Sequence, residues 1–186
     1  MKNITKRIVI LMMCVISFTT LSGFAYASEE TNYPYVEYIL PENRGFKSYM
    51  DYEAITSTAS KQYRMQKFAK TNYRGLRMIE DRYLIAVGTM FGASVGQFVT
   101  LTLENGSVIE CIVGDIKADK DTDDMNLFTL RNGCCSEFIV ETSALPYETR
   151  TSGDISKMYT NWNSPVYSVD IHPLYFDIDE NEKENN

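Results

Sequence analysis

The sequence predicts a mainly β protein, in which a small closed barrel follows an extended lead. Residues 97–103 alternate between apolar and polar side chains, which is the period of a half-buried strand. Residues 104–107 (ENGS) follow, and Asn-Gly supplies the positive φ angles of a tight turn between twisted strands. Residues 108–113 return as a mainly apolar partner, so the pattern predicts a β-hairpin.

Three further segments have the composition of strands. Residues 83–87 (YLIAV) are an apolar run, and residues 136–140 (SEFIV) and 166–171 (VYSVDI) follow an acidic loop at 114–133. Five short strands at irregular spacing, with one long loop among them, favour a small closed barrel over a sandwich. The barrel domain is expected to span residues 75–172.

The residues before the barrel, 28–74, are expected to form an extended lead with a short helix. They are rich in Tyr, Glu, Pro and Asn and lack a sustained hydrophobic period, except at residues 57–70. There the apolar side chains form a rough helical face, and either Ser57 or Ser60 is placed to cap its start.

Residues 1–27 are predicted to be a signal peptide. Three basic residues precede an apolar core at 8–16, and the triplet AYA at 25–27 is a small-x-small cleavage pattern. The alternative is a retained membrane anchor, but a spanning helix needs about 20 apolar residues, and polar residues interrupt this core from Ser17 onward. We therefore expect a mature chain of residues 28–186, secreted or associated with the cell envelope, with no membrane span.

The chain is strongly acidic. Its net charge is −7, and loss of the three basic residues of the signal leaves 15 Lys and Arg against 25 Asp and Glu. Binding to nucleic acid or anionic lipid needs clustered Lys and Arg, so neither is an expected partner. Much of the acidic excess lies within residues 173–186, which have no apolar anchor after Ile178 and are predicted to form a disordered tail.

Three cysteines remain in the mature chain. A disulfide is permitted outside the cytoplasm, and the predicted bridge joins Cys111 to Cys134 or Cys135. A catalytic thiol is the alternative, and it would need His172, the only histidine, as its base. His172 precedes Pro173 at the end of the last predicted strand, a position typical of a plain strand exit.

Several short blocks resemble a known barrel family. Residues 83–88 (YLIAVG), 95–96 (VG), 114–115 (GD) and 137–140 (EFIV) are similar to the double-psi β-barrel of three-aspartate (3D) domains and of membrane-bound lytic transglycosylase A. The resemblance implies a six-stranded double-psi-like barrel that acts on peptidoglycan or another wall glycan. It also implies that the family's catalytic aspartate falls on Asp115, the second residue of GD, and a second acid on Glu137.

A second likeness covers residues 75–171. They are similar to a family of exported proteins from anaerobic Gram-positive bacteria, through the blocks GLRM, ENG, NGC, SEF and WNS. This likeness supports one exported barrel-like domain and implies no activity. The chain also departs from the 3D pattern, because Ile-Lys-Ala follows Asp115 where that family has Thr-Gly-Gly.

Asp115, with Glu137 across the barrel, is the candidate catalytic pair. A lytic transglycosylase needs one carboxyl group that protonates the glycosidic oxygen and then deprotonates the sugar hydroxyl that closes an anhydro ring. Burial suits a carboxyl group to this task by raising its pKa. Lys117 and Asp119 are candidate binding residues beside it. In the structural alternative, Asp115 caps a turn and Lys117 merely pairs with it.

Trp162, the only tryptophan, is a candidate binding residue. If its ring is exposed, it can stack on the apolar face of a sugar, because pyranose rings pack on aromatic rings as other apolar groups do. If the ring is buried, it belongs to the core.

The loop at 119–126 imitates the opening of a calcium-binding loop. Asp119, Asp121 and Asp123 have the alternate spacing that places oxygens around a hard cation. However, Asp124 stands in place of the turn glycine and Leu130 in place of the bidentate glutamate. We therefore expect a solvated acidic loop and no metal.

Two functions are consistent with these residues. In the first, the protein is a peptidoglycan lytic transglycosylase with Asp115 as acid and base and Glu137 as support. In the second, the same barrel is a non-catalytic module that binds the cell wall or a partner. In both cases we expect a monomer that needs no cofactor.

The cleavage pattern predicts a mature N-terminus at Ser28, because signal peptidase cuts after a small-x-small triplet. N-terminal sequencing of exported protein should therefore begin Ser-Glu-Glu. Exported protein that begins at Met1 would contradict the prediction.

Overall fold

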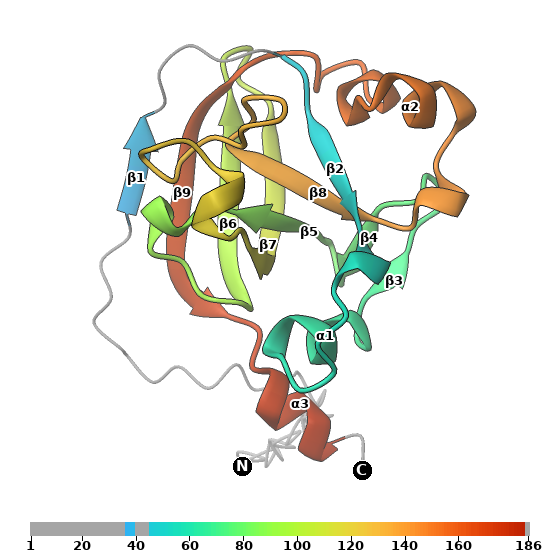
Figure 1. Ribbon diagram of the computed structural model, residues 1–186, viewed down its shortest axis with the longest axis vertical. Coiled ribbons are helices and arrows are strands. Elements are labelled where there is room, and N and C mark those ends of the chain that lie inside the picture. Colours follow the sequence, from blue (N-terminus) through green and yellow to red (C-terminus); the bar gives the residue numbers. More distant parts are fainter. Residues whose placement is uncertain (1–35, 40–44, 185–186) are drawn as a thin grey trace, which may run out of the picture. The chain divides into compact units, whose positions relative to one another are not determined.

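The computed structural model describes residues 36–39 and 45–184, and the predicted signal peptide and its cleavage site lie outside these ranges. The described residues form a mixed sheet of nine strands with three α-helices, so the fold is mainly β, as predicted (Figure 1). The strands are β1 (Val36–Ile39), β2 (Ser48–Asp51), β3 (Lys70–Thr71), β4 (Arg77–Ile79), β5 (Arg82–Val87), β6 (Gln97–Leu103), β7 (Val108–Ile116), β8 (Ser136–Val140) and β9 (Val166–Tyr175). The helices are α1 (Lys61–Gln66), α2 (Tyr147–Ser152) and α3 (Ile178–Glu184).

The predicted hairpin forms the middle of this sheet. Strands β6 and β7 pair antiparallel, and Gly106 adopts a φ of +80° in the turn between them, the conformation for which glycine is suited. Strand β5 pairs with β7 in parallel, with β4 through its first residues, and with β8 through its last. Three neighbours make β5 the central strand, which explains why its residues 84–87 are an unbroken apolar run with 0–1% exposure.

The strand pairs form an open path. The order is β1-β9-β6-β7-β5-β4-β3, with β8 attached to β5 and β2 attached to β8. Among the described strands this path does not return to its starting strand, so the sheet is not closed. The six-stranded closed barrel remains a prediction.

Two hydrophobic clusters lie on opposite faces of the sheet. Neighbouring residues of β5 alternate between them, with Ile85 in the larger cluster and Leu84 in the smaller, because successive side chains of a strand point to opposite faces. The smaller cluster also contains Met65 of α1 and Ile178 of α3. The two helices therefore cover this face, and they lie together at one end of the sheet (Figure 1).

The lead has more structure than its composition predicts. Helix α1 falls inside residues 57–70, and the Ser60 hydroxyl accepts a hydrogen bond from the backbone N–H of Tyr63, as the capping pattern predicts. The lead also supplies β1, which pairs with β9, and β2, which pairs in parallel with β8. Both partners are distant in sequence, so local periodicity gave no sign of these two strands.

The prediction of a disordered tail at 173–186 was wrong. Strand β9 continues to Tyr175, and α3 follows it. The Asp177 carboxylate accepts hydrogen bonds from the backbone N–H groups of Asp179 and Glu180 and so caps the helix. Ile178 is only 4% exposed, because it packs into the smaller cluster. One buried side chain and one cap order a segment that is otherwise acidic.

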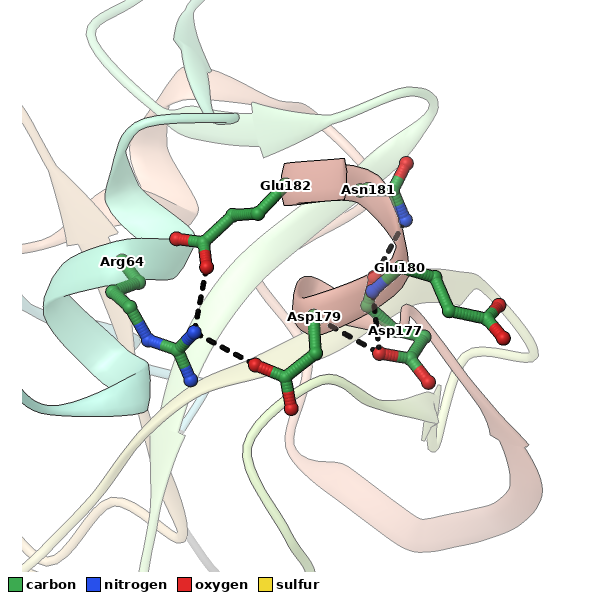
Figure 2. A network of polar contacts seen from close by, with 6 residues as sticks. All are labelled: Arg64, Asp177, Asp179, Glu180, Asn181 and Glu182. Carbon is green, nitrogen blue, oxygen red and sulfur yellow. Dashed lines mark hydrogen bonds and ion pairs between the residues drawn. The ribbon is translucent and has the colours of Figure 1, made fainter. Parts of the chain in front are cut away.

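Arg64 of α1 connects that tail to the rest of the sheet domain. Its Nη1 donates to Asp179 Oδ1 at 2.7 Å and to Glu182 Oε2 at 2.6 Å, so one guanidinium holds two carboxylates of α3 (Figure 2). Beside this ion pair, Phe68 and Phe176 make an edge-to-face contact with ring centroids 5.4 Å apart. Two carboxylates of the acidic tail are thus paired with a basic residue that lies far away in the sequence.

The predicted disulfide is not formed. Cys111, Cys134 and Cys135 are free, buried thiols. Cys111 lies opposite Tyr83 near the start of β5, whereas β8, which follows Cys135 directly, begins opposite Val87 at the other end. Cys111 and Cys135 both lie in the larger hydrophobic cluster, but no bond joins their sulfur atoms, and Cys111 Sγ lies 3.5 Å from Ile109 O instead.

Replacing Arg64 should release α3 while the sheet stays folded. In Arg64→Ala, the amides of residues 178–184 should exchange faster with deuterium, while the melting temperature falls little, because exposed ion pairs contribute little to global stability. Arg64 lowers the pKa of Asp179 in the folded protein, so this contribution is present above the ordinary aspartate pKa and is lost as the pH falls below it. The exposed Lys67→Ala is the matched control, and equal α3 exchange in both variants would contradict the contact's role.

The three thiols should be unreactive in the folded protein. Burial raises their pKa values, that of Cys135 to about 12, so almost no thiolate is present near neutral pH. In protein that begins at Ser28, Ellman's reagent should titrate no thiol in buffer and three in guanidinium. A disulfide-linked Cys111 peptide in a non-reducing digest would show instead that oxidation reorganises this region.

Candidate functional site

The structure brings the two predicted carboxylates to one face of the sheet. Asp115 of β7 and Glu137 of β8 both lie opposite Ala86 of the central strand β5, one on each side of it. Residues opposite each other in a ladder point to the same face, and two strand spacings separate their backbones by about 9.6 Å. This is the face covered by α1.

A bulge in β7 determines that Asp115 lies on this face. Val113 pairs with Ile85 and Asp115 with Ala86, so Gly114 is an extra residue without its own partner on β5. In an unbroken ladder Gly114 would occupy the position opposite Ala86, and Asp115 would turn to the larger hydrophobic cluster. The bulge sends Ile116 toward that cluster instead, where it packs against the core.

Gly114 is the residue this bulge requires. A Cβ atom at this position would come 2.6 Å from Cδ1 of Ile139 and 3.2 Å from Cβ of Leu84. The first contact would force the terminal methyl of Ile139 to move and the second is tight, so glycine lets β7 pass its neighbours without displacing them.

Lys117 bridges the two strands that carry the acids. Its backbone N–H donates to Val87 O at 2.9 Å, which continues the ladder one residue beyond β7. Lying two positions after Asp115, it shares the same face, and its ammonium forms an ion pair with Glu137 Oε2. The two side chains are 15% and 10% exposed, so this pair is largely desolvated.

The second oxygen of Glu137 is also occupied. Asn132 Nδ2 donates to Glu137 Oε1 at 3.3 Å, and Asn132 Oδ1 accepts from the backbone N–H of Cys134 at 3.1 Å. Asn132 was not predicted as a site residue, since an Asn-Gly pair in a loop indicates a turn and nothing more. The glutamate is therefore held by partners on both sides.

Asp115 is in a different electrostatic position. Burial raises its pKa, and this effect outweighs the three influences that lower it: the backbone N–H of Ile116, the charge of Lys117 and the side-chain amide of Gln62 on α1. Burial also lowers the pKa of Lys117, against the carboxylates of Asp115 and Asp121. The site thus holds one acid that resists ionisation and one that faces an ammonium.

The other two predicted binding residues lie elsewhere. Asp119 is exposed, and its carboxylate accepts a hydrogen bond from the Thr89 hydroxyl at 2.7 Å. Trp162 is only 5% exposed and packs against Phe138 and Tyr159, with ring centroids 5.2 and 4.1 Å away. Of the two alternatives for Trp162, the structure shows the core residue, and its ring offers no exposed platform for a sugar.

In the acidic loop, the Asp123 carboxylate accepts hydrogen bonds from the backbone of the same loop. Asp123 Oδ1 accepts from the backbone N–H groups of Leu127 and Phe128 at 2.8 and 3.1 Å. Within the described ranges, no three His, Cys, Asp or Glu side chains converge as a metal site would require.

His172 follows Ile171 on β9, which pairs with Val99 and through it lies level with Cys111. Ile171 and Cys111 share the larger hydrophobic cluster, so the His172 side chain points to the opposite face, where its Nε2 is 2.7 Å from the Thr100 hydroxyl.

No helix of the described residues has the length and apolar composition needed to cross a membrane. No protein-family model matches the chain, and no curated protein or solved structure matches it either.

Proposed function

We propose that the protein is an exported cell-envelope protein that cleaves wall glycan by lytic transglycosylase chemistry. The observation that carries the proposal is the pairing of Asp115, whose pKa is raised by burial, with an ion-paired glutamate on the same sheet face. Two carboxyl groups whose environments differ in this way are the usual arrangement of an acid and its electrostatic support.

Asp115 alone can carry both proton transfers. The protonated carboxyl group gives its proton to the glycosidic oxygen as the bond from that oxygen to the anomeric carbon breaks. The carboxylate left behind then takes the proton of a hydroxyl of the same sugar, whose oxygen bonds to the anomeric carbon and closes an anhydro ring. The proton returns to Asp115, so no water and no cofactor is consumed.

Glu137 and Lys117 supply the electrostatic setting of these steps. The anomeric carbon becomes positively charged as the bond breaks, and a carboxylate on the same face stabilises that developing charge. Lys117 holds the Glu137 carboxylate in place through the ion pair. Because both groups are largely desolvated, their fields act at higher strength than in water.

A double-psi-like barrel is part of the proposal. It is supported by β7, which pairs in parallel with β5 on one side and antiparallel with β6 on the other, and by the resemblance of the residues at 83–88 and 137–140. Export is supported by the signal-like residues 1–27. The net negative charge of the chain would repel a polyanion, whereas an uncharged glycan is not repelled.

A second candidate function has its own supporting observation. Both oxygens of Glu137 are occupied by side chains of this chain, and Asp115 and Glu137 line neither the cavity beside α1 nor the cavity between β4 and Phe176. Such a site is closer to a structural network than to an open cleft. In this case the domain binds the wall or a partner without cleaving it.

Replacing Asp115 by Asn separates these functions. In Asp115→Asn the release of anhydro-muropeptides from purified peptidoglycan, measured by mass spectrometry, should fall by about 10²–10⁴, because the amide has no transferable proton. The melting temperature should change little, since burial already disfavours the charged form of Asp115. In the wild type, activity should fall as the pH rises through the raised pKa, because the reaction starts from protonated Asp115.

The control is Asp124→Asn, an exposed acid of the neighbouring loop, which should leave release unchanged. If Asp115 only caps a turn, its replacement should cost about 1 kcal/mol of stability. Wild-type protein that binds the sacculus and releases nothing would favour the binding module.

A further inference from the structure

Arg74 differs from the other shielded arginines of the described chain, because its terminal nitrogens have no acceptor. Arg64, Arg77 and Arg82 are also buried or half-buried, and each donates from a terminal nitrogen to an oxygen atom of the protein. Within residues 36–39 and 45–184, no oxygen accepts from Nη1 or Nη2 of Arg74, and no carboxylate lies within ion-pair distance. A guanidinium can only donate, so this edge needs an acceptor from solvent or from a ligand.

The turn that carries Arg74 is fixed by Asn72. The Asn72 Oδ1 accepts from the backbone N–H groups of Arg74 at 2.9 Å and of Leu76 at 3.1 Å. Gly75 adopts a φ of +85°, and its N–H donates to Asn72 O at 3.0 Å. Asparagine side chains commonly close turns in this way, so the backbone of Arg74 is held between β3 and β4.

Two tyrosine rings position the guanidinium. Its central carbon lies 4.5 Å from the centre of the Tyr159 ring and 5.3 Å from that of Tyr73, and both rings attract the cation. Its Nε also donates to the Tyr73 hydroxyl at 3.0 Å. These contacts use Nε and the stacking surface of the cation, and they leave the edge formed by Nη1 and Nη2 unoccupied.

The Tyr159 ring is itself held by the core. The Tyr83 hydroxyl donates to the Tyr159 hydroxyl at 3.3 Å, and the Trp162 ring packs on the Tyr159 ring with centroids 4.1 Å apart. Trp162 is buried in the larger hydrophobic cluster. The cation therefore rests on a fixed platform, and a positioned arginine loses little freedom when a ligand binds.

The chemistry of this edge favours a carboxylate. The two oxygens of a carboxylate can accept parallel hydrogen bonds from one guanidinium. One unpaired cation matches one negative charge, whereas the net charge of −7 on the chain opposes a phosphate dianion more strongly. Tyr73 is 85% exposed, so its ring can pack against an aromatic group beside the carboxylate.

We infer that Arg74 and Tyr73 form a binding site for a carboxylate carried next to an aromatic ring. Nη1 and Nη2 of Arg74 donate to the two carboxylate oxygens, and the Tyr73 ring packs on the aromatic group. A free aromatic acid presents this chemistry, and so does the C-terminus of a peptide that ends in an aromatic residue. The site is independent of the proposed cleavage, because Tyr159 packs against the larger hydrophobic cluster and Asp115 points to the opposite face of the sheet.

Binding is tested with N-acetylphenylalanine as the probe and its uncharged amide, N-acetylphenylalaninamide, as the matched control. The acid should show saturable, millimolar binding, with amide shift changes concentrated at residues 72–76. The fluorescence of Trp162, the only tryptophan, should change as well, since its ring contacts Tyr159. The amide should bind at least about tenfold more weakly, because it cannot form the charge-assisted pair.

Two further ligands define the class. An N-acetylated pentapeptide that ends in phenylalanine should bind about tenfold more tightly than N-acetylphenylalanine if the site takes a peptide end, and equally if it takes a small acid. Phenyl phosphate that binds more tightly than the carboxylates would overturn the assignment to a carboxylate.

Two variants locate the site. Arg74→Lys keeps the charge but loses the planar fork, so the affinity for N-acetylphenylalanine should fall about tenfold. Tyr73→Leu removes the exposed ring and should also weaken binding. The control is Arg131→Lys, at an exposed arginine outside the site, which should bind as the wild type does. Equal binding of acid and amide, no saturable binding of the acid, or full affinity in folded Arg74→Lys would overturn the inference.

Discussion

The extra residue in β7 is the constraint on which the candidate site depends. At the bulge, Gly114 has no partner on β5, and every later residue of β7 changes face relative to an unbroken ladder. Asp115 and Lys117 therefore meet Glu137 beneath α1 rather than turning toward the larger hydrophobic cluster, where a charge would be far more costly. A side chain at the bulge would crowd Ile139 and Leu84, which glycine avoids.

Segments from both ends of the described chain then determine how far the face that carries Asp115 is shielded from solvent. Helix α1 lies over it, and the C-terminal helix α3 holds α1 through Arg64 and through Ile178 in the shared cluster. The burial that raises the pKa of Asp115 includes α1, since Gln62 reaches its carboxylate. The chemistry available to one aspartate is thus coupled to the packing of two short helices that are more than 110 residues apart in the sequence.

The parts of this structure that the sequence could predict are those determined by local residues. Alternation and the Asn-Gly turn predict the hairpin of β6 and β7, and a capping serine predicts α1. The pairing of β2 with β8, the bulge at Gly114 and the contact of Asn132 with Glu137 depend on residues far apart or on a single inserted position. The disulfide prediction was wrong for the same reason, because it assumed a strand register that the sequence does not contain.

Asp115 and Glu137 lie in different electrostatic environments. The Lys117 ammonium contacts Glu137 directly, whereas it acts on Asp115 only through its charge. Lys117 lowers the pKa of Asp115 by its charge, but burial raises it by more. The protonated form of Asp115 is therefore favoured relative to an exposed aspartate. The same ammonium is in direct contact with Glu137, whose negative charge compensates it. Without Glu137, Lys117 would act on Asp115 as an unpaired cation, and the aspartate would ionise more easily. In the proposed reaction, Glu137 would therefore support proton transfer by compensating the charge of Lys117, without touching the proton.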